Sequence, residues 1–160
     1  MMVRLAGKIM IVAVGKLHGV YWRAAQQEYL ARLRRYTDVT LIEVKDVVGR
    51  GTPDGVAMQR EGEALLAAVK GAHYTLALTP TGRQMDSPQL AEFLRKQIEV
   101  YTSLAFVIGG PVGLAPQVVA ACNEALSLSA LTFPHELARV ILLEQLYRAA
   151  TIIGGEKYHK

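Results

Sequence analysis

The sequence predicts an α/β fold in which a mainly parallel sheet carries helices on both faces. Five short apolar or alternating runs of the strand type are separated by segments with helical periodicity. Parallel strands need such helical crossovers. The chain of 160 residues is 51% hydrophobic, with no internal repeat or linker, so residues 1–160 are expected to form one domain with a real core.

The first strand and helix follow from periodicity. Lys8–Val14 is a mostly apolar run that ends at Gly15, which predicts a strand buried on both faces. Apolar and aromatic side chains then recur at steps of three and four, which predicts an amphipathic helix over His18–Arg35. Asp38–Lys45 alternates as a strand does, and the glycines and proline of Asp46–Asp54 indicate a loop.

The middle of the chain repeats this alternation. Gly55–Lys70 is predicted to be a helix, and His73–Thr79 is predicted to be the third strand. Pro80–Asp86 has the composition of a turn-rich connection. Ser87-Pro88 supplies an N-cap and a proline at the first helical position, so a helix is expected from here to about Val100.

The last third begins with a predicted strand over Leu104–Ile108, which leads directly into a glycine-rich loop. A short helix over Pro116–Leu126 and a short extended piece over Ser127–Ser129 are expected next. Pro134 begins a last helix that reaches about Ile153 and is apolar on most of its circumference. Such a helix is either central to the fold or packed against a second subunit, and we favour the subunit interface.

Composition excludes several classes of protein. No apolar run approaches the roughly 18 residues of a membrane span, and the run after Lys8 is too short for a signal peptide. The single Cys122 cannot pair within the chain, which favours a reducing compartment and a cytoplasmic location. The four histidines are scattered, so no metal site is expected.

Charge is unevenly distributed along the chain. The net charge is +4, but the segment from Met1 to Tyr36 holds seven basic residues, Arg23 among them, and one acidic residue. This excess suggests that a polyanion contacts the first third of the chain. An ordinary solvated helix face would give the same pattern.

Three loops that follow predicted strands have the composition of a ligand site, namely Leu78–Gly82, Ile108–Leu114 and Leu126–His135. Glycines let a ligand approach the backbone, although a tight turn also needs them. The third loop offers backbone groups beside small and apolar side chains, which suits an adenine ring. The sequence has no G-x-G-x-x-G, P-loop or G-x-S-x-G motif, and this absence disfavours an oxidoreductase or hydrolase function.

Two further features carry polar chemistry. His135 stands at a helix start, where the helix dipole disfavours its cationic form, so it is either a neutral general base or a structural histidine. Residues 154–160 form a tail in which a Gly-Gly pair precedes Tyr158, His159 and Lys160. Such a tail is either frayed or suited to stacking on an RNA base and pairing with its phosphate.

Taken together in this order, these motifs resemble the ribosomal RNA large subunit methyltransferase H family, the pseudouridine N3-methyltransferases of the SPOUT superfamily. The similarity runs from Lys8 to Lys160 and leaves residues 1–7 as an expected N-terminal extension. Val112 departs from the family pattern, in which an acidic or polar residue is common at this position. The resemblance rests on Val12–Lys16, Ile108–Leu114, Leu126–His135, Arg139–Val140, Glu144–Ala149 and Tyr158–Lys160.

The resemblance implies a C-terminal trefoil knot, a homodimer and S-adenosylmethionine as methyl donor. The implied substrate is pseudouridine 1915 in helix 69 of 23S ribosomal RNA, within assembled ribosomes. A non-catalytic ribosome-binding or RNA-binding protein that retains the fold is the alternative. The implied cofactor residues are Leu78, Gly109, Leu128, Ser129, Ala130, Leu131, Thr132 and Phe133.

A mechanism follows as a hypothesis. A neutral His135 or His159 accepts the N3 proton of the target base, directly or through water. The catalytic residues expected on this basis are His135, Tyr158 and His159, and the residues expected to contact RNA are Arg23, Arg139, Arg148, Tyr158, His159 and Lys160. Glu144 and Arg148 are four residues apart in the favourable order and are expected to pair.

Overall fold

The computed structural model describes residues 2–160, and Met1 lies outside the described residues. The strands in this range are β1 (Lys8–Val14), β2 (Asp38–Val44), β3 (Tyr74–Gln84), β4 (Ser103–Ile108) and β5 (Glu124–Ser127). The helices are α1 (Val20–Leu33), α2 (Asp54–Ala68), α3 (Ser87–Tyr101), α4 (Pro116–Ala121) and α5 (His135–Ile153).

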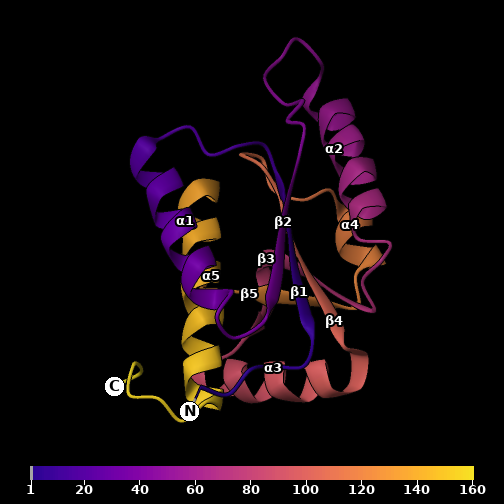
Figure 1. Cartoon of the computed structure of the whole chain (residues 1–160). Coiled ribbons are helices and arrows are strands. Elements are labelled where there is room, and N and C mark those ends of the chain that lie inside the picture. The colour runs from indigo at the N-terminus through magenta and orange to yellow at the C-terminus, as the bar shows by residue number, and fades with distance from the viewer. Residues whose placement is uncertain (1) are drawn as a thin grey trace.

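All strand pairs are parallel, and the order across the sheet is β2-β1-β4-β3-β5. The sheet stands at the centre of the molecule with helices on both of its faces (Figure 1). This arrangement confirms the predicted α/β fold. The trefoil knot that the family resemblance implies stays a prediction.

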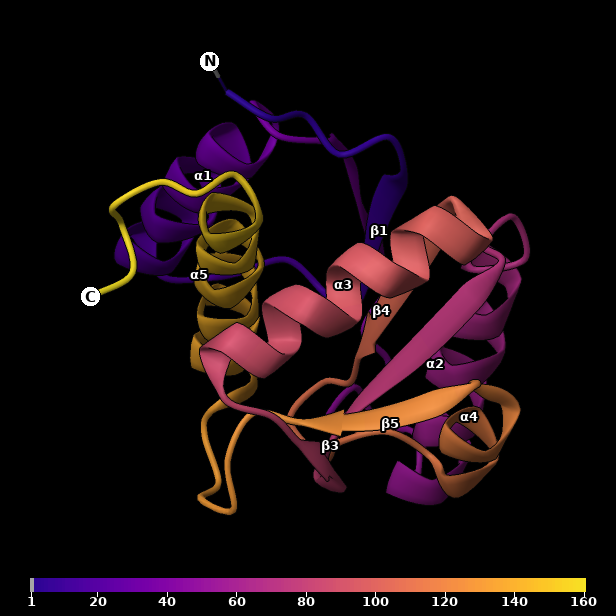
Figure 2. The same ribbon diagram turned by 90° about the horizontal axis from the view of Figure 1, so that it is seen from below.

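The two faces of the sheet bury two separate apolar clusters. Helices α1, α3 and α5 cover one face, and α2 with α4 covers the other (Figure 2). Side chains alternate between the faces along β1: Ile9 and Ile11 enter the first cluster, whereas Val12 and Val14 enter the second. Burial on both faces is the reason why β1 and β4 read as nearly continuous apolar runs.

Predicted boundaries fail around the outer strand β5. The helix predicted over Pro116–Leu126 ends at Ala121, and the extended piece lies at Glu124–Ser127 instead of Ser127–Ser129. Strand β3 continues to Gln84, so most of the predicted turn-rich connection is strand. Pairing with β5 explains both errors, because β5 pairs with residues up to Leu78 and, after a register shift, with Arg83 and Gln84.

The N-cap of α3 is Asp86 and not the predicted Ser87. The Asp86 carboxylate accepts from the Gln89 backbone N–H at 2.8 Å, and the Gln89 side chain accepts from the Asp86 N–H at 2.9 Å. This reciprocal capping box outcompetes the single hydroxyl of Ser87. Pro88 falls in the first turn, where it removes no helical hydrogen bond.

Helix α5 is central to this chain. It lies beside α1 and α3 over the first face of the sheet (Figure 2), and its buried apolar residues are Val140, Leu142, Leu143, Leu146, Ala149 and Ala150. Much of the apolar circumference is therefore explained within the chain. Leu137, Ile141, Tyr147, Ile152 and Ile153 stay partly exposed, and the subunit interface stays a prediction. No helix within residues 2–160 is long and apolar enough to cross a membrane.

Candidate functional site

A cavity of about 440 Å³ lies beside Leu78–Pro80 of β3 and the carboxyl end of β4, where the three predicted segments meet. The first of them, Leu78–Gly82, is part of β3 and not the predicted loop. The cavity brings together seven of the eight predicted cofactor residues, namely Leu78, Gly109, Leu128, Ser129, Leu131, Thr132 and Phe133. Ala130 belongs to the same loop but is exposed and does not line the cavity. The site position follows from parallel topology, because loops from neighbouring strands converge at the carboxyl edge.

The glycine loop after β4 folds back on itself in a way that excludes a side chain. A Cβ on Gly109 would lie 2.5 Å from the carbonyl carbon of Gly113. The Gly113 N–H donates to the Gly110 carbonyl at 3.0 Å, and Gly113 has a φ of 81°. Glycine is required at both positions for different reasons, close approach at Gly109 and left-handed backbone at Gly113.

The loop between β5 and α5 is fixed to Pro80 of β3 through a buried serine. The Ser127 Oγ lies 3.0 Å from the Pro80 carbonyl oxygen and 2.9 Å from that of Ser129. The Leu131 N–H donates to the Ser129 hydroxyl at 3.0 Å. These bonds leave Leu131 at the rim of the cavity, 70% exposed. An exposed leucine at a cavity rim offers apolar contact to a ligand.

Among the described residues that line the cavity, His135 alone has an ionisable side chain. It occupies the first position of α5, and Ala138 of the next turn lines the cavity beside it. Burial lowers the pKa of the His135 imidazole, and Glu136 partly opposes this effect. The side chain is therefore neutral at pH 7 and able to accept a proton.

Arg139 does not occupy the position expected of an RNA ligand. Its side chain is 1% exposed, and its guanidinium donates to the carbonyls of Val14 at 3.0 Å and Gly15 at 2.8 Å. It also pairs with Glu43 at 2.7 Å. Within the described residues its Nε has no partner. The guanidinium joins α5 to the ends of β1 and β2. The predicted RNA contact is therefore not seen, because the side chain is buried and holds elements of the fold together.

The tail after α5 packs against that helix instead of fraying. The Tyr158 hydroxyl donates to Glu144 at 3.1 Å, and the Arg148 guanidinium stacks on the Tyr158 ring at 4.7 Å. Arg148 also pairs with Glu144, as predicted, and lies 3.4 Å from His159 Nδ1. We name Glu144, Arg148, Tyr158 and His159 the tail cluster. Lys160 is exposed at its end.

The tail cluster and the cavity lie apart within one chain. No tail residue lines the cavity, and the tail meets α5 at Glu144 and beyond, whereas the cavity meets α5 at its first turn. Figure 1 shows the tail at the far end of α5. The structure therefore brings His135 to the cofactor loops but does not bring Tyr158 or His159 there.

Sequence reasoning missed two positioning carboxylates. Glu136 accepts from the His18 backbone N–H at 3.2 Å and so joins the loop after β1 to the start of α5. Glu61 is 2% exposed and accepts from the backbone N–H groups of Val47 and Val48. Their partners are backbone groups more than ten residues away, so no local pattern marks them. Within the described range, no three His, Cys, Asp or Glu side chains gather as metal ligands.

Comparison with known proteins gives a consistent picture. A family model described as "Predicted SPOUT methyltransferase" matches residues 8–159. Two relatives carry the name "Ribosomal RNA large subunit methyltransferase H". The one from Gemmatimonas aurantiaca is 40% identical and covers 96% of this chain and 99% of its own. The one from Symbiobacterium thermophilum is 43% identical, with the same coverage of both chains.

Two solved structures share the fold at low sequence identity. A probable methyltransferase from Bordetella pertussis matches with a TM-score of 0.61 at 14% identity, over 91% of this chain and 98% of that one. A probable methylase family protein from Haemophilus influenzae matches with a TM-score of 0.59 at 16% identity, over 95% of this chain and 70% of that one. At these identities the likeness concerns the fold alone.

Proposed function

The chain belongs to the SPOUT methyltransferase family, and from this premise we propose that it transfers a methyl group from S-adenosylmethionine to large-subunit ribosomal RNA. The observation that carries the proposal is the cavity at the carboxyl edge, whose walls are the loops that also carry the family resemblance. The names of relatives that match nearly the whole chain support the class of substrate.

The cavity fits this cofactor in size and chemistry. A volume of about 440 Å³ falls in the usual range for a ligand of a few tens of atoms. Apolar side chains such as Leu78 and Leu131 suit the faces of an adenine ring, and loop backbone groups suit its edges. When bound, S-adenosylmethionine supplies an electrophilic methyl group on a sulfonium. The one titratable residue of the wall, His135, is neutral and does not repel that charge.

The finer substrate that we propose is N3 of a pseudouridine in helix 69 of assembled ribosomes. In the transfer the N3–methyl bond forms as the sulfur–methyl bond breaks, and the N3 proton must leave to a base. His135 meets this need because it lines the cavity and its lowered pKa keeps it neutral. The enzyme otherwise contributes alignment of the two reacting atoms. We expect a cytoplasmic protein, since ribosomes are its target.

We further propose that the protein acts as a homodimer in which each complete site takes its cavity from one copy and its tail cluster from the other. The support is the separation of these two features in one chain: Arg148 of the tail cluster follows His135 of the cavity wall by 13 residues of α5, a rise of about 20 Å. A second copy that packs antiparallel on the first would bring each tail near the other copy's cavity.

Two measurements test the activity itself. Calorimetric titration with S-adenosylmethionine should show binding to the wild-type protein, and the Gly109→Ala variant should lose it because a Cβ clashes with Gly113. Transfer of a labelled methyl group should occur on ribosomes that lack the modification and be weak on free ribosomal RNA. Absence of cofactor binding would favour the non-catalytic RNA-binding alternative, and transfer to tRNA in place of ribosomes would overturn the substrate.

Mixing two inactive variants tests the shared site. A chain lacking Tyr158–Lys160 keeps its cavity, and the Gly109→Ala chain keeps its tail. Refolding the two together should restore methyl transfer through mixed dimers, whereas each alone stays inactive. Circular dichroism of each variant serves as the control for folding. No recovery, with mixed dimers detected by mass spectrometry, would contradict the two-copy site.

A further inference from the structure

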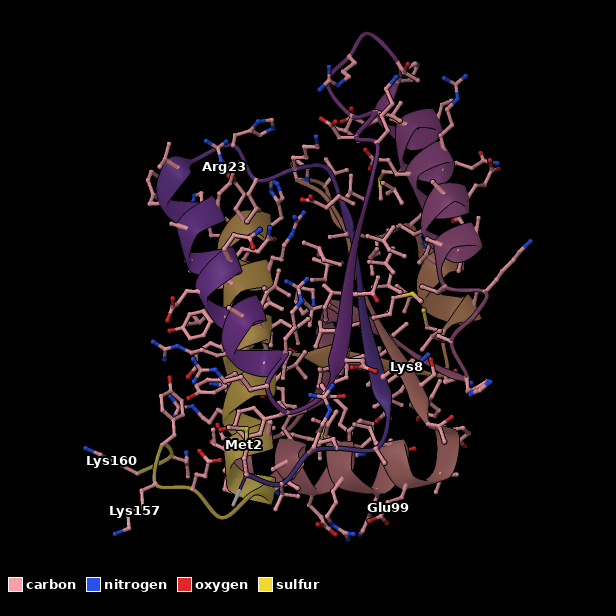
Figure 3. The ribbon with its side chains drawn as sticks, viewed as in Figure 1. Met2, Lys8, Arg23, Glu99, Lys157 and Lys160 are labelled. Carbon is pink, nitrogen blue, oxygen red and sulfur yellow. The ribbon has the colours of Figure 1, made fainter. Side chains whose placement is uncertain are left out.

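Four exposed cations gather at the carboxyl edge of β1 and β2. Lys16 follows β1, Arg23 lies in the first turn of α1, Lys45 follows β2, and Arg50 lies in the loop between β2 and α2. We call them the edge cations. In the part of the chain that the structure describes, Lys16, Arg23 and Lys45 make no salt bridge. Figure 3 shows Arg23 at the opposite end of the molecule from Lys8.

Acidic side chains at this edge are already engaged. Glu43 is paired with Arg139, Glu136 accepts from the His18 N–H, and Glu61 is buried against backbone N–H groups. Asp46 is paired with Arg50 alone, and the Arg50 side chain stays 59% exposed. Glu61 and Glu136 keep their negative charge, because a backbone N–H does not neutralise a carboxylate. The edge therefore presents three exposed cations without an ion-pair partner among residues 2–160, Lys16, Arg23 and Lys45, and their side chains are available to a phosphate.

The edge cations lie on the same edge of the sheet as the cavity, because β1 and β4 are parallel with Ala13 beside Ile108. The loops after β1 and β2 lie against each other, since a Cβ on Gly15 would be 3.4 Å from the Asp46 side chain. The loop after β1 is in turn bonded to Glu136, the neighbour of His135 on the cavity wall. A strand of RNA with one base at the cavity would therefore pass over this edge.

The loop that carries Arg50 has a fixed root and an open tip. Glu61, on α2, accepts from the N–H groups of Val47 at 2.7 Å and Val48 at 3.2 Å. At the tip, Gly49 and Gly51 have φ values of 80° and 81°, and nothing lies within 4 Å of a Cβ built on either. Two glycines thus set the backbone around Arg50, while a buried carboxylate holds the base of the loop.

We propose that the edge cations bind the phosphates of the RNA strand that flanks the target nucleotide, with Lys16, Lys45 and Arg50 extending the contact predicted for Arg23. The inference rests on the proposed function, which makes RNA the substrate. At the opposite edge Lys96 is paired with Glu92, whereas Lys8 and Lys70 are exposed and make no salt bridge among the described residues. What distinguishes the edge cations from these is their place on the same edge of the sheet as the cavity.

Two triple variants of equal charge change test the proposal. The edge variant is Lys16→Gln, Lys45→Gln and Arg50→Gln, and the control variant is Lys8→Gln, Lys70→Gln and Lys96→Gln, all at exposed positions. The probe is a fluorescein-labelled RNA hairpin with a single-stranded loop, titrated by anisotropy at several KCl concentrations. Loss of three phosphate contacts should lower the affinity of the edge variant for the hairpin about tenfold or more. It should also lower the magnitude of the slope of log K against log salt concentration by about two.

The control variant should bind as the wild type does. On ribosomes, the edge variant should show a raised KM with kcat nearly unchanged, and its affinity for S-adenosylmethionine should equal that of the wild type. Equal weakening of both triples, or wild-type affinity of the edge variant, would overturn the proposal. So would failure of the wild-type protein to bind either the hairpin or ribosomes. If the edge variant alone loses RNA affinity while no protein transfers methyl groups, the surface stands and the methyltransferase function fails.

Discussion

Helix α5 carries two arginines that differ in burial and in structural role. Arg139, near its start, is 1% exposed and donates to two backbone carbonyls and to Glu43. Arg148, nine residues later, is 25% exposed, pairs with Glu144 on its own helix and stacks on the ring of Tyr158. The first arginine ties the sheet to the helix, and the second orders a chain terminus.

The contrast extends to the surroundings of each arginine. At the cavity end, burial lowers the pKa of His135 and so favours its neutral form, and the Arg139 guanidinium is paired with Glu43. At the tail end, charged and aromatic groups meet each other at a half-exposed surface. The largely apolar lining of the cavity suits the rings of a cofactor, whereas the charged and aromatic tail cluster suits RNA. The helix thus separates the two halves of the proposed reaction.

The largest expected effect comes from removing the tail. Deletion of Tyr158–Lys160 should abolish methyl transfer, a loss of more than about a thousandfold, because positioning of the RNA loop is lost with contacts to the base. Affinity for S-adenosylmethionine should stay within about twofold, because the tail and the cavity are separate. Labelled-methyl transfer and calorimetry measure the two. Full activity of the truncated protein would remove the tail from the mechanism.

The second effect concerns stability and compares the two arginines directly. Arg139→Met strands two carbonyls and the Glu43 carboxylate, so it should lower the free energy of unfolding by about 3 kcal/mol. Arg148→Met removes the partly exposed salt bridge to Glu144 and should lower the free energy of unfolding by about 1 kcal/mol or less. Urea unfolding at pH 7 measures both.

A double variant identifies the source of the larger loss. Adding Glu43→Met to Arg139→Met should recover part of the stability, because no unpaired carboxylate is then left half-buried. If the two single variants cost the same, the distinction between a buried and an exposed arginine on α5 would fail.

The difference between these arginines also marks the limit of prediction from sequence. The sheet, its helices and the three segments that line the cavity were predicted, because buried parallel strands leave continuous apolar runs and ligand loops leave glycine and small residues. The first segment, Leu78–Gly82, is strand and not the predicted loop. Arg139 and Arg148 were both expected to contact RNA, since nothing local shows that the carbonyls of Val14 and Gly15 lie opposite one of them. The position of β5 was missed because its partners on β3 are some fifty residues away.

The third effect tests the neutral histidine of the cavity end. His135→Gln should lower kcat about a hundredfold if His135 is the general base. For the wild type, the acid limb of kcat/KM should have its midpoint below 6.5, because burial lowers the pKa of His135 and only the neutral form accepts a proton. This limb should vanish in the variant. His73→Gln, at the amino edge of the sheet, should leave the profile unchanged.

The smallest effect tests how the tail is held. The Tyr36 hydroxyl donates to Glu156 at 2.7 Å, and burial, followed by the Glu156 carboxylate, raises the pKa of Tyr36 to about 12. Tyr36→Phe should cost about 1 kcal/mol at pH 7, since Glu156 is exposed and regains water.

The same tyrosine predicts a pH dependence with a definite sign. Because its pKa is raised in the folded state, the unfolded chain ionises first, so wild-type stability should fall from about pH 10 to pH 12. The Phe variant lacks this loss, and urea unfolding across this range should show the two curves converge. Methyl transfer at pH 7 should fall only slightly, because Glu144 and Arg148 still hold Tyr158. A loss as large as that of the truncation would instead make Glu156 the main anchor of the tail.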